Sequence, residues 1–103
     1  MSAPVDLLAV GPHPDDVELF IGGTLAASTA NGRSVAVVDL SRGEMASRGS
    51  VAERAAEADE ARALLGLSDC LQLGLPDGGI SEHRRDQVDA LVAALRRLRP
   101  TIV

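Results

Sequence analysis

Residues 5–18 read VDLLAVGPHPDDVE, and this stretch decides the fold. Its first six residues form a nearly continuous apolar run, which is typical of a parallel strand buried on both faces. From Val17 onward the sequence predicts a helix. The turn between strand and helix therefore carries one imidazole, from His13, and two adjacent carboxylates, from Asp15 and Asp16. In open α/β proteins, ligands bind at turns of this kind.

The rest of the chain repeats this alternation of strand and helix. Apolar runs predict further strands at residues 35–40 and 70–75, and the start of a fourth at residues 101–103. Periodicity and end signals predict helices at about residues 16–31, 50–66 and 81–99. The βαβαβαβ order predicts an α/β fold with a Rossmann-like, doubly wound parallel sheet in three layers. We expect residues 1–103 to form a single domain, truncated after its fourth strand begins beside the first.

The predicted helices carry packing and capping signals of their own. In the first helix, Phe20, Thr24 and Ala27 share one face. The pair Gly22–Gly23 inside it indicates close packing against a neighbouring element, because each glycine costs about 1 kcal/mol relative to alanine. Ser50 opens the second helix with a capping box, and Ser81 opens the third. The third helix has an apolar stripe, formed by Val88, Leu91, Val92, Leu95 and Leu98.

Composition limits the partners that this chain can have. The net charge of −5, with one Phe and neither Tyr nor Trp, disfavours nucleic acids and anionic membranes. We expect neither a signal peptide nor a membrane span. Cys70 is the only cysteine, so we expect a buried strand thiol and a cytoplasmic protein. The expected partner is a small molecule, and an unpaired sheet edge allows a homo-oligomer.

The first turn has the donor atoms of a metal site. His13 and Asp16 offer one nitrogen and one oxygen ligand, a pair that suits zinc, whose catalytic sites use three protein ligands and a water. Asp15 lies between them in sequence and could accept a proton from that water. The long loops at residues 41–49 and 74–80 also follow strands, so they share this edge of the sheet. The alternative is that one aspartate caps the helix and His13 is an ordinary turn residue.

Several motifs resemble one enzyme family. The stretch GPHPDDVE at residues 11–18, followed by GGT at residues 22–24, is similar to the first signature of the PIG-L/LmbE-like zinc-dependent N-acetylglucosamine deacetylases. The similarity continues through DLSRGE at residues 39–44, RGS at 48–50, Glu53, Arg54 and Glu57, and LPDG at 75–78. Within the family, the chain most resembles the branch that deacetylates N-acetylglucosaminyl malate in bacillithiol biosynthesis.

The resemblance implies a role for each matching residue. His13 and Asp16 would bind Zn²⁺, and Asp15 would be the general base in hydrolysis of the acetamide to acetate and a free amine. Substrate contacts would come from Arg54, Arg48 and Glu44. Pairing with Glu57 is the alternative for Arg54, and solvated loop charges are the alternative for the other two.

The resemblance also places part of the site outside this sequence. The family takes its third zinc ligand from a His-x-x-His segment after the fourth strand, beyond Val103. His83 does not match that segment and is expected to face solvent. We therefore expect residues 1–103 alone to bind zinc poorly and to be inactive.

Three other functions compete with this interpretation. A nucleotide-binding module would place Asp39 near a ribose, although a Gly-x-Gly-x-x-Gly motif is missing. An inactive fragment could serve assembly through its open edge strand. A magnesium-dependent phosphoryl-transfer enzyme could use Asp15 and Asp16, but His13 is a poor ligand for Mg²⁺.

Overall fold

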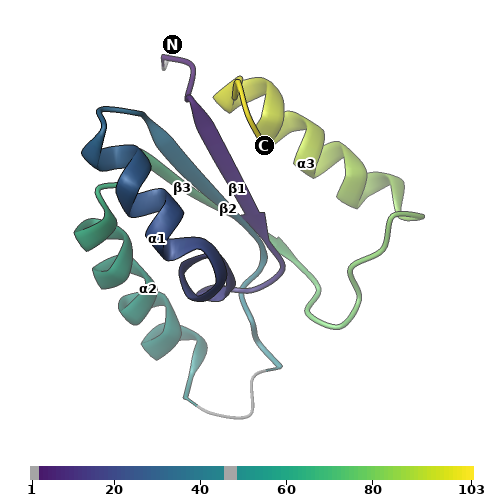
Figure 1. Cartoon of the computed structure of the whole chain (residues 1–103). Helices are drawn as coiled ribbons and strands as arrows, with labels where there is room; N and C mark the ends of the chain where they lie inside the picture. Colours follow the sequence, from purple (N-terminus) through teal and green to yellow (C-terminus); the bar gives the residue numbers. More distant parts are fainter. Residues whose placement is uncertain (1–2, 46–48) are drawn as a thin grey trace.

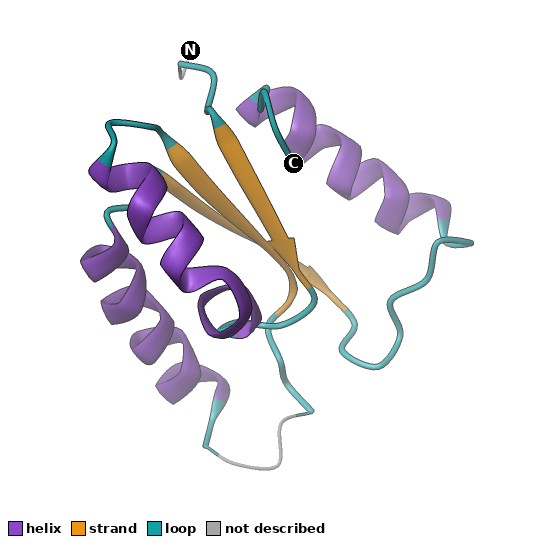
Figure 2. Cartoon of the chain, in the orientation of Figure 1, coloured by secondary structure: helices purple, strands orange, loops and turns teal. Residues whose placement is uncertain are grey.

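The computed structural model describes residues 3–45 and 49–103. Strands and helices alternate in the order β1 (Leu7–Gly11), α1 (Asp16–Ala30), β2 (Val35–Ser41), α2 (Val51–Leu65), β3 (Asp69–Leu75) and α3 (Arg85–Leu98). Figures 1 and 2 show α1 and α2 on one face of the sheet and α3 on the other. The predicted doubly wound α/β fold with three layers is confirmed.

The strands form a parallel sheet in the order β1-β2-β3. Leu7 lies opposite Val35 in one pair, and Val37 lies opposite Cys70 in the other. Ile102 forms a parallel bridge to Leu7, so the last residues run along the other edge of β1. The segment predicted as a fourth strand thus lies beside the first, as expected. Because the strands are parallel, the turns that follow them share one edge of the sheet.

Each face of the sheet has its own hydrophobic core. Residues 35–38 of β2 are all fully buried, which explains their uninterrupted apolar sequence. The core beneath α1 contains Ala9, Val17, Leu25, Val35 and Val37. The core beneath α3 contains Val5, Leu8, Ala36, Val38, Ala94 and Leu98. The sheet and its two cores hold the site-bearing turns in fixed relative positions.

Helix α1 packs through a different face from the predicted one. Val17 and Leu25 are buried, whereas Phe20 is 83% exposed, and Thr24 and Ala27 are also exposed. The helix kinks at Ile21, whose φ of −134° is not helical. Apolar residues occur on every side of this segment, so periodicity does not single out the buried face.

The prediction of close packing at Gly22–Gly23 is also wrong for the described residues. A Cβ added at either position would meet nothing within 4 Å. The two glycines directly follow the kink at Ile21. Paired glycines are a common cause of helix kinks, so the pair marks a bend rather than a contact.

The other two helices differ in how well their starts were predicted. Ser50 caps α2 as expected, because its hydroxyl accepts a hydrogen bond from the Glu53 N–H at 3.0 Å. Helix α3 begins at Arg85 rather than near Ser81. The side chain of Gln87 accepts a hydrogen bond from Ser81 N–H at 2.8 Å and donates one to Gly79 C=O at 3.0 Å. These bonds hold the preceding residues in a loop. The predicted stripe packs through Leu91, Leu95 and Leu98.

Strand β3 is the edge strand, and its residues alternate between half-buried and exposed. Cys70 lies on its exposed side, so the expectation of a buried thiol is wrong. Periodicity alone does not distinguish a central strand from an edge strand. Within the described residues, no helix has both the length and the apolar character needed to cross a membrane.

Candidate active site

The turn from β1 into α1 is held by backbone contacts on both sides. A Cβ added at Gly11 would lie 2.9 Å from Cγ2 of Val17, so only glycine fits where the strand passes beneath the helix. The carbonyl of Pro12 accepts hydrogen bonds from the N–H of Ser41 at 3.0 Å and from its hydroxyl at 2.8 Å. Pro14 is buried. The end of β2 therefore fixes the turn that carries the candidate metal ligands.

His13 and Asp16 point toward each other, as the sequence predicts. Nδ1 of His13 lies 3.1 Å from Oδ2 of Asp16, and the same oxygen accepts a hydrogen bond from the His13 N–H at 3.0 Å. The side chain of His13 is 39% exposed and that of Asp16 is 25% exposed. Both groups are thus accessible from outside, and the backbone bond fixes the direction of the carboxylate.

The other imidazole nitrogen of His13 contacts Asp77. Nε2 lies 2.8 Å from Oδ1 of Asp77, and the side chain of Asp77 is only 9% exposed. The contact joins residues 64 positions apart, across the loops that follow β1 and β3. Sequence reasoning did not include Asp77 among the site residues. The signals that could have found it are the LPDG motif and the position of its loop at the carboxyl edge of the sheet.

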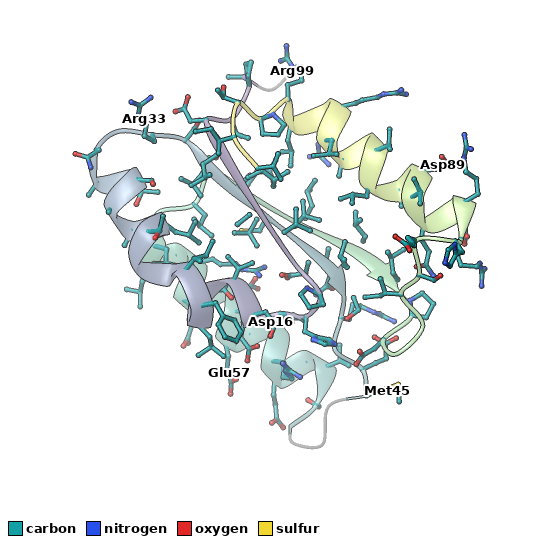
Figure 3. The ribbon with its side chains drawn as sticks, turned by 45° about the vertical axis from the view of Figure 1, so that its right-hand side comes forward. Asp16, Arg33, Met45, Glu57, Asp89 and Arg99 are labelled. Carbon is teal, nitrogen blue, oxygen red and sulfur yellow. The ribbon has the colours of Figure 1, made fainter. Side chains whose placement is uncertain are left out.

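The loop after β2 braces Asp77. Glu44 Oε2 accepts a hydrogen bond from the Asp77 N–H at 3.0 Å, and Asp77 Oδ2 accepts one from the Met45 N–H at 2.9 Å. Figure 3 shows Met45 and Asp16 at the same end of the molecule, opposite Arg33 and Arg99. The three loops that follow the strands are therefore joined directly.

These hydrogen bonds shift the ionisation of the site. The bond to Asp77 is the main cause that raises the pKa of His13; partial burial opposes it, and the bond to Asp16 adds to it. The bond from the Met45 N–H is the main cause that lowers the pKa of Asp77, and the bond from the Asp77 N–H is the main cause that lowers the pKa of Glu44. The loop carboxylates are thus stabilised as anions around one imidazole.

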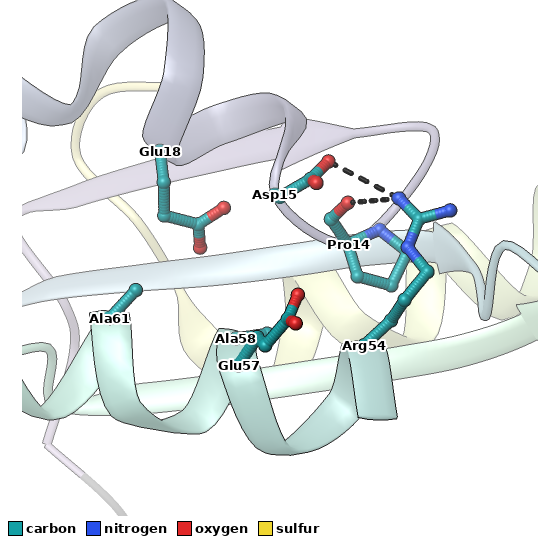
Figure 4. Close-up of a pocket in the computed structure, with 7 residues that line it drawn as sticks. All are labelled: Pro14, Asp15, Glu18, Arg54, Glu57, Ala58 and Ala61. Carbon is teal, nitrogen blue, oxygen red and sulfur yellow. Dashed lines mark hydrogen bonds and ion pairs between the residues drawn. The ribbon is translucent and has the colours of Figure 1, made fainter. Parts of the chain in front are cut away.

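Asp15 points away from His13 and toward α2. Its φ of 78° is left-handed, a conformation that aspartate adopts more readily than most residues. Arg54 donates to Oδ1 of Asp15 at 3.4 Å and to the carbonyl of Pro14 at 3.1 Å (Figure 4). Arg54 therefore contacts the turn itself rather than only its helical neighbour Glu57. The Asp15 side chain is 52% exposed, so its carboxylate remains accessible from solvent.

A small cavity of about 60 Å³ lies between the Asp15 turn and α2. Its lining residues, shown in Figure 4, are Pro14, Asp15, Glu18, Arg54, Glu57, Ala58 and Ala61. The volume is enough for water. On the other side of the turn, an apolar groove of about 290 Å³ runs beside Asp16, Phe20 and Ile21. The turn is thus accessible from two directions.

A buried ion network joins α1, β2 and α2 next to the site. Arg62 donates to both carboxylate oxygens of Asp39 at 2.8 Å and to Oε1 of Glu18 at 2.7 Å. The Asp39 side chain is fully buried, and burial raises its pKa, although the bonds from Arg62 oppose this. Asp39 therefore cannot contact a ribose, which removes the main support for the nucleotide-binding alternative.

The donor atoms fit a zinc ion in part. Ligands about 2.0–2.1 Å from a tetrahedral zinc lie about 3.3 Å from each other, close to the 3.1 Å between His13 Nδ1 and Asp16 Oδ2. Residues 3–45 and 49–103 contain no group of three or more His, Cys, Asp or Glu that could hold a metal. His83 does not join the pair, and its side chain is 86% exposed, as expected. Arg48 lies outside the described residues. The described part brings together two candidate metal ligands, His13 and Asp16.

Comparison with known proteins assigns the family. Residues 8–103 match the PIG-L family, described as GlcNAc-PI de-N-acetylase. The chain therefore belongs to the PIG-L family, as the motifs indicate.

Three relatives illustrate the match. The 1D-myo-inositol 2-acetamido-2-deoxy-alpha-D-glucopyranoside deacetylase of Actinosynnema mirum is 31% identical, over all of this chain and 47% of its own length. The conserved protein TT1542 from Thermus thermophilus superposes with a TM-score of 0.89 at 50% identity, over 95% of this chain and 44% of its own. The N,N'-diacetylchitobiose deacetylase from Pyrococcus horikoshii gives a TM-score of 0.83 at 28% identity, over 94% of this chain and 39% of its own. The chain thus spans about half the length of the curated relatives it matches.

Proposed function

We propose that this chain is the N-terminal part of a zinc-dependent N-deacetylase that hydrolyses the acetamide of an N-acetylglucosaminyl conjugate. The observation that carries the proposal is the arrangement of the first turn. His13 and Asp16 converge with their donor atoms 3.1 Å apart, and Asp15 points away from them with half its surface exposed. One turn therefore offers a pair of metal ligands and a separate carboxylate for proton transfer.

The residues of this turn would divide the work between them. His13 and Asp16 would hold the zinc ion, which when bound supplies a Lewis acid for the acetamide and lowers the pKa of water. Asp15 would accept a proton from the attacking water and deliver it to the departing amine. Arg54 fixes the side of the turn on which Asp15 lies, through its bonds to Asp15 and Pro14. The third zinc ligand would come from outside residues 1–103.

We assign the substrate to the class of N-acetylglucosaminyl conjugates, with N-acetylglucosaminyl malate of bacillithiol biosynthesis as the specific candidate. The support is the sequence resemblance to that branch, together with relatives named as deacetylases of acetylated amino sugars. Arg54, Arg48 and Glu44 would contact the sugar or the malate. We also propose that the protein is cytoplasmic and that its partner is a small-molecule substrate. The proposal holds whether or not the protein forms a homo-oligomer.

The activity test uses the full polypeptide that contains residues 1–103. Asp15→Asn should reduce acetate release by about 10²–10⁴-fold, because it removes the proton acceptor. Bound zinc, measured by elemental analysis, should stay close to the wild-type amount. Asparagine also tolerates the left-handed conformation of this position, so the fold should persist.

Two results would contradict the proposal. Loss of zinc from the Asp15→Asn variant would make Asp15 a ligand rather than the base. Unchanged turnover would remove Asp15 from the reaction. Asp69→Asn, at the opposite end of β3 from the site, is the matched control and should keep both activity and zinc. Parallel assays with malate and inositol conjugates of N-acetylglucosamine would decide the substrate.

A further inference from the structure

We infer that Asp77 is a positioning residue that selects the tautomer of His13, and so directs the lone pair of Nδ1 toward Asp16. This inference rests on the proposed metal site for its functional meaning. It concerns a contact between two loops that the motif in the first turn does not include. Asp77 touches neither the ion nor the substrate in this account and acts only through His13.

The hydrogen bond between His13 and Asp77 has only one possible direction. An ionised carboxylate can only accept, so Nε2 must be the donor in the 2.8 Å contact with Asp77 Oδ1. A neutral imidazole has one protonated nitrogen, and its lone pair then lies on Nδ1. Asp16 could compete for the proton from the other side. Its contact is longer, at 3.1 Å, and its side chain is 25% exposed against 9% for Asp77. The proton of the neutral imidazole therefore lies on Nε2, toward Asp77.

The lone pair of His13 Nδ1 faces Asp16 as a result. With Nε2 protonated, Nδ1 of His13 and Oδ2 of Asp16 are both acceptors, and they lie 3.1 Å apart. Two acceptors at this distance repel each other unless a proton or a cation lies between them. Ligating histidines commonly donate their second N–H to a carboxylate, which sets the tautomer and orients the ring. Asp77 occupies that place for His13.

Asp77 is itself held in place by the loop that follows β2. Its Oδ2 accepts from the Met45 N–H at 2.9 Å, which leaves Oδ1 for His13. Its own N–H donates to Glu44 at 3.0 Å. Gly78 has a φ of 81°, and a Cβ there would lie 2.9 Å from the sulfur of Met45. The carboxylate is thus fixed at both oxygens and at its backbone, so its orientation does not depend on bound metal.

This geometry makes a sharp prediction for Asp77→Asn. The Met45 N–H still requires an acceptor, so the amide oxygen should turn toward Met45 and the NH₂ group toward His13. Nε2 would then become the acceptor, and the proton would move to Nδ1, where it can bond to Asp16. Every hydrogen bond is satisfied, so the fold should be kept while the His13 lone pair points away from the ligand pair.

The experiment reads the tautomer directly by ¹⁵N NMR of the imidazole nitrogens in alkaline buffer, without metal. The chain has two histidines, and the exposed His83 is an internal reference. The wild type should show His13 protonated at Nε2, and Asp77→Asn should show it protonated at Nδ1. Asp77→Ala should give a mixture, and it serves as the second variant if the first does not fold. Asp69→Asn, at the end of β3 far from the Asp77 loop, should leave the wild-type pattern.

A Zn²⁺ titration of the full polypeptide supplies the second measurement. Asp77→Asn should weaken zinc binding by about 10–100-fold, the range for loss of an outer-sphere partner. The inference is overturned if both Asp77 variants keep the wild-type tautomer, or if zinc binds to Asp77→Asn as tightly as to the wild type. If the wild type binds no zinc, the proposed function fails, while the metal-free tautomer still decides the role of Asp77.

Discussion

Gly11 shows how a single residue can set the site. It lies at the end of β1, where a methyl group would overlap Cγ2 of the buried Val17. Val17 is β-branched and has little rotamer freedom to move aside. We therefore predict that Gly11→Ala lowers the free energy of unfolding by about 1–3 kcal/mol, as overpacking in a core does. Urea denaturation would measure the change.

Gly23→Ala is the matched control for this prediction. Gly23 lies within α1, and an added Cβ would meet nothing within 4 Å. Alanine at a helical position is favoured over glycine by about 0.5–1 kcal/mol, so this variant should be more stable than the wild type. Equal effects of the two substitutions would show that contact with Val17 is not what requires glycine at position 11.

The ionisation of His13 predicts a pH dependence of stability in the metal-free protein. The bond to Asp77 raises its pKa in the folded state above the unfolded value of 6.5. The folded state therefore binds a proton more tightly than the unfolded state does. The stabilisation is fully present below pH 6.5, and it is lost as the pH rises through the folded pKa.

Thermal unfolding in the presence of a chelator tests this pH dependence. The wild type should lose stability between pH 6.5 and the raised pKa, and His13→Gln should not show that loss. His83→Gln removes an exposed imidazole and should behave as the wild type. A pH profile unaltered by His13→Gln would contradict the assignment.

At the scale of elements, Arg62 connects two helices and a strand. It lies on α2 and binds Asp39 of β2 and Glu18 of α1, with its side chain 9% exposed. Removing one partner of a buried ion pair leaves an uncompensated charge, which costs about 3–5 kcal/mol. We predict that Arg62→Met lowers the free energy of unfolding by that amount.

Arg85→Met is the comparison for Arg62. Arg85 pairs with Asp89 at 3.0 Å on the exposed surface of α3. Exposed pairs contribute little, so this variant should change stability by less than about 1 kcal/mol. Denaturation of both variants in the same buffer would check the difference. Similar losses would mean that the network under the site is no stronger than a surface pair.

The elements also show what could be predicted from sequence. The apolar runs of β1 and β2 are buried on both faces, so they were found directly. The face of α1 was not, because its apolar residues surround the helix and its bend at Ile21 changes the buried side. The start of α3 was misplaced because Gln87 holds the preceding loop by contacts that no periodicity reveals.

At the scale of the whole molecule, the site divides into a local part and a distant part. His13, Asp15 and Asp16 lie in one turn, so their spacing was visible in the sequence. Asp77 lies 64 residues from His13, and Arg54 lies 39 residues from Asp15. Only the parallel order of the strands brings these residues to the same edge of the sheet. The motif therefore predicted the candidate ligands that lie together, and the fold was needed to find Asp77 beside His13.

The most direct test of the proposed metal site is a crystal structure of the full polypeptide grown with zinc and measured at the zinc absorption edge. The anomalous peak should lie within bonding distance of both His13 Nδ1 and Asp16 Oδ2. Asp15 should lie outside the coordination sphere, and His13 Nε2 should keep its hydrogen bond to Asp77. Zinc coordinated by Asp15 would contradict this account. So would a fully occupied zinc site elsewhere in the protein with no zinc at this turn.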